Sequence, residues 1–130
     1  MKYLLLIAAI TLLLANSCKE QFVEEIIDDP AKHNMKFIPD NPGSGDQIKL
    51  VIYEDCNYNV LSGIMRNGKI VDIEKQFNGM MKRPCLIQND TISIGKLPEG
   101  IYTVHYKLMD IAPVPPKSTL SLTFLLVVSR

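Results

Sequence analysis

The stretch LPEGIYTVHYKLMD, residues 97–110, decides the fold expected for this chain. Pro98 and Gly100 are turn-forming residues, and the side chains that follow them alternate between two faces. One face is apolar and consists of Tyr102, Val104, Tyr106 and Leu108. The other face is mostly polar and consists of Ile101, Thr103, His105 and Lys107. Because successive side chains of a strand point to opposite faces, this alternation predicts a long, half-buried β-strand.

Six further strands are predicted outside this stretch. They are rich in Val, Ile, Thr and aromatic residues, and clusters of Gly, Pro, Asn and Asp separate them. Asn67-Gly68 predicts a tight hairpin between the third and fourth strands. We therefore expect one all-β domain over residues 35–130, an antiparallel sandwich or barrel with strands at 35–39, 47–54, 58–65, 69–76, 91–94, 101–109 and 119–128.

Residues 97–106, with Asp110 and the closing hydrophobic strand, resemble the last two strands of bacterial immunoglobulin-like and fibronectin-type domains. In those domains a Leu and a Gly precede a Tyr whose hydroxyl pins a loop, the tyrosine corner. The resemblance implies an immunoglobulin-like β-sandwich with Tyr102 at the corner. Many bacterial repeats have Gly-Asn after the Asp, where this chain continues to a proline-rich run at residues 113–116. Transthyretin-like sandwiches share the Gly-x-Tyr feature, so the subfamily stays open.

The first 17 residues have the three parts of a signal peptide. Lys2 gives a positive start, an almost unbroken apolar run reaches from Tyr3 to Leu14, and small residues precede Cys18. As a helix the run would rise only about 18 Å, against roughly 30 Å of hydrocarbon in a bilayer. We expect residues 1–17 to be removed rather than to remain as a membrane span.

Ala15-Asn16-Ser17-Cys18 resembles the lipobox of bacterial lipoproteins, whose cysteine thiol receives a diacylglyceryl group. The resemblance implies lipidation of Cys18 and a protein anchored in the cell envelope. We expect the outer membrane, with the domain facing either the periplasm or the outside. Leu usually stands three places before the Cys, where this chain has Ala15. Ordinary signal peptidase is the alternative, and it would leave a soluble secreted protein with a free Cys18.

Residues 18–34 are predicted to be a flexible acidic tether. Asp28-Asp29-Pro30 breaks any regular structure there, and acidic residues outnumber lysines. A short charged stretch after the Cys also resembles the surface-export signals of Bacteroidetes-type lipoproteins.

In the whole chain, 14 Lys and Arg balance 14 Asp and Glu, so the protein has no net charge that would attract nucleic acid. We expect no nucleic-acid partner.

Three cysteines in an exported chain leave one unpaired unless it has another use. Lipidation would use Cys18, and we expect Cys56 and Cys85 to form a disulfide in an oxidising compartment. The chain-entropy model assigns a loop of this size a stabilisation of about 3.6 kcal/mol. Free or metal-binding thiols are the alternative.

Residues 76–89 are the longest irregular stretch and the predicted binding loop, because binding residues concentrate on loops held by a rigid scaffold. The candidate binding residues are Phe77, Met80, Met81, Lys82 and Arg83. Asn89-Asp90-Thr91 fits the N-glycosylation sequon, and Asp90-Thr91-Ile92 resembles the O-glycosylation motif of Bacteroidetes, with Thr91 as the acceptor. Either modification would mark an exposed loop.

The sequence contains no recognisable catalytic or cofactor-binding motif. His105 is the only histidine of the predicted domain, and Met80 and Met81 lack the spacing of soft-metal sites. We expect a non-enzymatic binding or assembly module without metal or other cofactor, which presents its loops to a protein or glycan partner in the envelope. Two alternatives remain: a small periplasmic carrier of metal or another ligand, and a purely structural envelope accessory.

Overall fold

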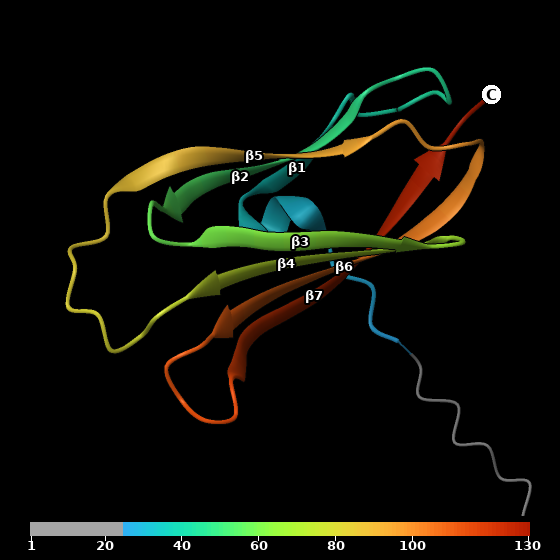
Figure 1. Ribbon diagram of the computed structural model, residues 1–130. Helices are drawn as coiled ribbons and strands as arrows, with labels where there is room; N and C mark the ends of the chain where they lie inside the picture. Colours follow the sequence, from blue (N-terminus) through green and yellow to red (C-terminus); the bar gives the residue numbers. More distant parts are fainter. Residues whose placement is uncertain (1–24) are drawn as a thin grey trace, which may run out of the picture.

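The computed structural model describes residues 25–130 of the chain. Seven strands form a three-stranded sheet in the order β1-β2-β5 and a four-stranded sheet in the order β3-β4-β6-β7, one facing the other (Figure 1). The predicted all-β sandwich of seven strands is therefore confirmed. In chain order the elements are a short 3₁₀ helix η1 (Pro30–His33), β1 (Met35–Ile38), β2 (Ile48–Cys56), β3 (Val60–Asn67), β4 (Ile70–Phe77), β5 (Ile87–Gly95), β6 (Gly100–Asp110) and β7 (Lys117–Val128).

The core lies between the two sheets and follows the alternation of the sequence. Ile48, Leu50 and Ile52 of β2 are all buried, as the pattern of that strand predicts. From the other sheet, β6 and β7 contribute their apolar faces, and Phe124 of β7 meets Phe37 of β1 edge-on with ring centroids 6.0 Å apart. Such edge-to-face aromatic pairs stabilise a core beyond the area that they bury.

A tight hairpin connects β3 and β4, as predicted, but its turn lies one residue later than expected. Asn67 pairs with Ile70, which leaves Gly68 and Lys69 as the central residues of the turn. Gly68 has φ +59°, a value that glycine adopts without steric penalty. A glycine in the first central position is the preference of a type II′ turn, whose twist matches that of the strands.

One strand pair departs from the predicted antiparallel arrangement. β4 lies beside β6 and runs parallel to it, with Ile73 opposite Tyr106. The burial of the hairpin strands explains this order: β4 buries Val71, Ile73 and Lys75, whereas most residues of β3 are exposed. β4, the more buried strand, takes the inner position between β3 and β6, and the exposed strand β3 takes the edge. A parallel pair needs a crossover, and here the chain passes through β5 of the opposite sheet.

The described part of the predicted tether, residues 25–34, lies against the sandwich. The Asp28 backbone N–H donates to the Thr123 carbonyl of β7 at 2.7 Å, and the Thr123 N–H donates back to Asp28 Oδ2 at 2.9 Å. Asp29 caps η1 by accepting from the Ala31 N–H at 3.1 Å. Two acidic residues of the predicted flexible tether, Asp28 and Asp29, therefore bind backbone amides, and regular structure begins before residue 35. The predicted leader and Cys18 lie outside the described residues.

Tyr102 makes the contact expected of a tyrosine corner. Its ring is buried, and its hydroxyl donates to the carbonyl of Pro98, four residues upstream, at 2.7 Å. Lys69 Nζ lies 4.4 Å from the centre of the same ring and donates to the Glu99 carbonyl at 3.1 Å. The connection from β5 to β6 is thus held to the β3–β4 turn.

Candidate functional site

Three loops gather at one end of the sandwich, which we call the distal end. They are the β2–β3 loop (57–59), the β4–β5 loop (78–86) and the β6–β7 loop (111–116). In Figure 1 they lie on the left, whereas residues 25–29, in blue, and the C-terminus lie toward the right. The distal end therefore points away from both ends of the described chain.

A disulfide bond between Cys56 and Cys85 fastens the β4–β5 loop to the end of β2, with the two Cα atoms 5.2 Å apart. The predicted disulfide is confirmed, and neither thiol is free to bind a metal ion. Next to it, the Asn57 N–H donates to the Leu86 carbonyl at 3.0 Å, and the Leu86 N–H donates to Asn57 Oδ1 at 3.2 Å. The covalent bond and these two hydrogen bonds hold two of the distal loops together.

The β6–β7 loop is joined to the same group by Asp110. Its Oδ1 atom accepts from the Gly79 N–H at 2.9 Å and from the Ala112 N–H at 3.0 Å. A Cβ atom at position 79 would lie 2.4 Å from Asp110 Oδ2, so a larger residue there would displace the Asp110 carboxylate. The three loops form one connected surface on a rigid sandwich.

Apolar side chains are exposed on this surface. Met80 is 79% exposed, Leu86 64% and Ile87 69%, and Val60 and Met81 are also exposed beside them. We call these five residues, together with the exposed cations Lys82 and Arg83, the distal loop surface. It includes part of a pocket of about 490 Å³ between the β2–β3 and β4–β5 loops. Contiguous exposed apolar groups with polar neighbours are typical of interaction sites.

The predicted binding residues divide into three groups in the structure. Met81 and Arg83 line the pocket, and Met80 and Lys82 are exposed. Phe77 is different, because it ends β4 and packs half-buried against Tyr58, with ring centroids 6.3 Å apart. The pocket-lining residues of the β2–β3 loop, the start of β3 and the end of the β4–β5 loop were not among the predicted binding residues. These are Asn57, Tyr58, Val60, Pro84 and Leu86. The Cys56–Cys85 pairing was the available signal, because it places the neighbours of both cysteines together.

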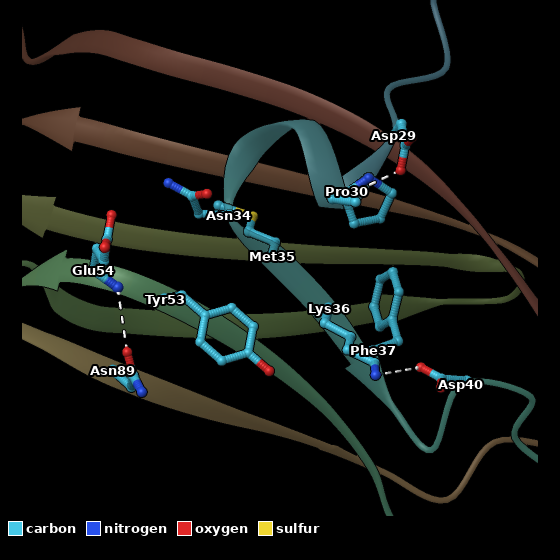
Figure 2. Close-up of a pocket in the computed structure, with 11 residues that line it drawn as sticks. Asp29, Pro30, Asn34, Met35, Lys36, Phe37, Asp40, Tyr53, Glu54 and Asn89 are labelled. Carbon is cyan, nitrogen blue, oxygen red and sulfur yellow. Dashed lines mark hydrogen bonds and ion pairs between the residues drawn. The ribbon is translucent and has the colours of Figure 1, made fainter.

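A larger pocket of about 680 Å³ lies beside η1, β1 and β2 (Figure 2). Tyr53, which is 37% exposed, is the partly open aromatic residue of its lining. Glu54 has φ +56°, a strained conformation for a residue with a side chain, and its N–H donates to Asn89 Oδ1 at 3.3 Å. The lining carries three carboxylates and a single cation, Lys36, so it favours neutral or cationic ligands.

The candidate glycosylation residues do not lie on a loop. Asn89 and Thr91 are part of β5, which begins at Ile87, four residues earlier than the predicted strand. The Thr91 side chain is exposed, and the Asn89 side-chain oxygen accepts the hydrogen bond from Glu54. The expected loop location is therefore wrong, because this segment extends the pairing of β5 with β2.

An ion cluster lies inside the sandwich near the distal end. Lys75 of β4 is fully buried and contacts Asp55 Oδ2 of β2, and its Nζ lies 2.6 Å from Asp90 Oδ2 of β5. Asp55 also accepts from Asn59 Nδ2 at 2.7 Å. Burial raises the pKa of the neighbouring Tyr106 hydroxyl far above its ordinary value, and the Asp55 and Asp90 carboxylates raise that pKa further. None of these three charged residues was predicted from the sequence as a site residue.

His105, the histidine considered for metal binding or catalysis, is occupied by two carboxylates. Its Nδ1 atom lies 2.9 Å from Asp72 Oδ1, and its Nε2 atom lies 2.8 Å from Glu25 Oε1. Within residues 25–130, no group of three or more His, Cys, Asp and Glu side chains has the arrangement of a metal site. The same part of the chain has no helix long and apolar enough to cross a membrane.

Comparisons of the chain with known protein families, with curated proteins and with solved structures find no match.

Proposed function

We propose that this protein is a lipid-anchored, non-enzymatic binding module of the bacterial cell envelope, and that the distal loop surface contacts a protein partner. The observation that carries the proposal is the exposure of apolar side chains on disulfide-tied loops, at the end of the sandwich away from residues 25–29. Apolar side chains with cations beside them suit a protein surface that combines apolar and acidic groups.

The anchor is tested by changing its predicted attachment residue. We expect Cys18→Ser to move the protein from the membrane fraction to the soluble fraction, because two or more acyl chains are needed for stable attachment and this variant would receive none. The measurement is the distribution of the protein between the two fractions in the native host. Ser17→Ala keeps a small residue before the Cys and should stay with the membrane. A wild-type chain found in the soluble fraction would contradict the anchor.

The distal loop surface is tested by site-specific photo-crosslinking in living cells. A photoreactive residue at position 80 should give a defined adduct, whereas the same residue at position 65 should give none. Met65 is the matched control, since it is a similarly exposed methionine on β3, at 72% against 79% for Met80, and lies outside the distal loop surface.

Truncation of the two loop methionines should weaken binding of the partner. In Met80→Ser/Met81→Ser the affinity for the partner should fall about tenfold or more, as for central interface residues. The free energy of unfolding should change by less than about 0.5 kcal/mol per exposed site. Equal adducts from positions 80 and 65, or an unchanged affinity in the double variant, would exclude this surface as the binding site.

A second candidate ligand is a glycan bound in the larger pocket of Figure 2. The supporting observation is the partly exposed Tyr53 ring among amide and carboxylate groups, because pockets with an apolar wall and a few polar groups suit small ligands. Tyr53→Ala should abolish binding to an array of envelope glycans, and Met80→Ser/Met81→Ser should leave that binding intact. The reverse pattern would remove the pocket from consideration.

A further inference from the structure

A lysine is enclosed between the two sheets of the sandwich beside two carboxylates. Lys75 is fully buried, although lysine is among the residues least often found inside proteins. It extends from β4 of the four-stranded sheet, whereas Asp55 and Asp90 extend from β2 and β5 of the opposite sheet. Lys75 Nζ contacts Asp55 Oδ2 and lies 2.6 Å from Asp90 Oδ2. The amine and the two carboxyl groups are thus held together across the core.

We propose that the side-chain amine of Lys75 and the side-chain carboxyl of Asp55 condense into an amide bond that joins the two sheets covalently, with Asp90 moving the protons. This modification site is separate from the distal loop surface and from the proposed function.

The condensation is balanced within the three side chains. A proton passes from the Lys75 ammonium through Asp90 to Asp55 Oδ2, which leaves a neutral amine beside a carboxylic acid. The nitrogen lone pair attacks Asp55 Cγ and forms the new C–N bond, while the carbonyl electron pair moves to Oδ1. The nitrogen gives a second proton through Asp90 to Oδ2, the C–Oδ2 bond breaks, and water leaves. Asp90 ends as the carboxylate that it was at the start, and nothing is oxidised or reduced.

The geometry assigns different roles to the two aspartates. The Asp55 side chain is only 9% exposed, and Asn59 Nδ2 donates to its Oδ1 atom at 2.7 Å. That oxygen carries the negative charge of the tetrahedral intermediate, so the amide donor stands where an oxyanion is stabilised. The Asp90 side chain is 35% exposed and can exchange protons with solvent, and its Oδ1 accepts from the Thr91 N–H at 2.8 Å.

Burial favours the amide over the ion pair. Charged groups in a protein interior carry a large desolvation penalty, and condensation replaces an ammonium and a carboxylate with one neutral group. Fixed contact between the reacting groups supplies the high effective concentration of intramolecular reactions. The enclosed position of Lys75 and Asp55 also keeps bulk water away from the product amide.

The test is a tryptic map of the full-length chain purified from cells, after reduction and alkylation of the cysteines. Trypsin does not cleave after an acylated lysine, so the amide should give one branched peptide that joins residues 50–66 to residues 70–82. Its mass should equal the two linear peptides less one water molecule. Free peptides 70–75 and 50–66 without the branched species would overturn the proposal. A branch between residues 70–82 and 83–96 would place the amide on Asp90 and overturn the assignment of Asp55.

Variants test the role of each group. Lys75→Arg keeps a cation but has no amine that can condense, and Asp90→Asn keeps the size of the side chain but cannot relay a proton. Both should reduce the branched peptide from near-complete yield to none. Lys36→Arg is the matched control, because Lys36 forms an exposed ion pair with Asp40, and it should keep the full yield. Full yield in Asp90→Asn would overturn the proton relay, and the wild-type map decides the amide even if a variant fails to fold.

Discussion

Lys75→Ala is expected to lower the free energy of unfolding by about 3–5 kcal/mol, measured by urea denaturation. Lys75 has two carboxylate partners, Asp55 and Asp90, and its loss leaves the buried Asp55 facing a cavity without a cation. An unpaired buried charge destabilises a fold more than the pair stabilised it, because the desolvation of the remaining partner is no longer offset. Loss of the proposed amide would add to this effect, since that bond joins β4 to β2.

The matched control for this prediction is Lys36→Ala. Lys36 Nζ lies 3.2 Å from Asp40 Oδ1, and the two side chains are 50% and 64% exposed. Solvent screens exposed ion pairs, so this change should alter the free energy of unfolding by less than about 0.5 kcal/mol. A change of similar size in both variants would show that burial of the Lys75 cluster has no special energetic role.

The double variant Cys56→Ser/Cys85→Ser is expected to lose about 3–4 kcal/mol of stability, from the entropy that the unfolded chain regains without the cross-link. The bond closes a loop with a sequence separation of 29 and fastens the β4–β5 loop to β2. Because that loop carries Met80 and Met81, the photo-crosslinked adduct from position 80 should also decrease. Thermal unfolding and the crosslinking assay measure the two effects separately.

Pro84→Ala serves as the control for the disulfide variant, because it changes the residue next to Cys85 and keeps the bond. It should leave the free energy of unfolding within about 1 kcal/mol of the wild type, since proline substitutions in loops have effects of this size. A double serine variant as stable as Pro84→Ala would contradict the energetic role of the disulfide. An unchanged adduct would show that the hydrogen bonds of the loop to Asn57 and Asp110 position it without the disulfide.

Local pattern was sufficient for most of the fold. Alternation in residues 97–110 and 119–128 predicted β6 and β7 and the faces that they bury, because period-two apolar residues can be buried together only on one side of a strand. Asn67-Gly68 predicted the β3–β4 hairpin, and the observed turn lies one residue later in the chain. The Cys56–Cys85 disulfide was predicted because the chain has three cysteines, of which lipidation would use one, and because an exported protein meets an oxidising compartment. Each of these inferences depends on neighbours in sequence or on residue counts.

The candidate sites were predicted less completely. The alternation of Val71, Ile73 and Lys75 placed Lys75 on the buried face of β4, and that signal was available. What the sequence did not contain was the position of Asp55 and Asp90, which approach from the other sheet. Likewise, the irregular sequence predicted Met80 to Arg83 as part of a loop. Val60 and Leu86 belong to the same surface because the disulfide fastens this loop to the end of β2, next to the start of β3.

The amino-acid sequence by itself determined the all-β class, the number of strands, the buried faces of β2, β6 and β7, and the cysteine pairing. Strand order was decided only by the tertiary structure: β4 rather than β3 lies beside β6, since the choice depends on which strand buries more of its surface against the opposite sheet. The same packing brings Lys75 against Asp55 and Asp90 and encloses it. Contacts of this kind join segments far apart in the chain, and the free energy that selects them comes from burial between the completed sheets.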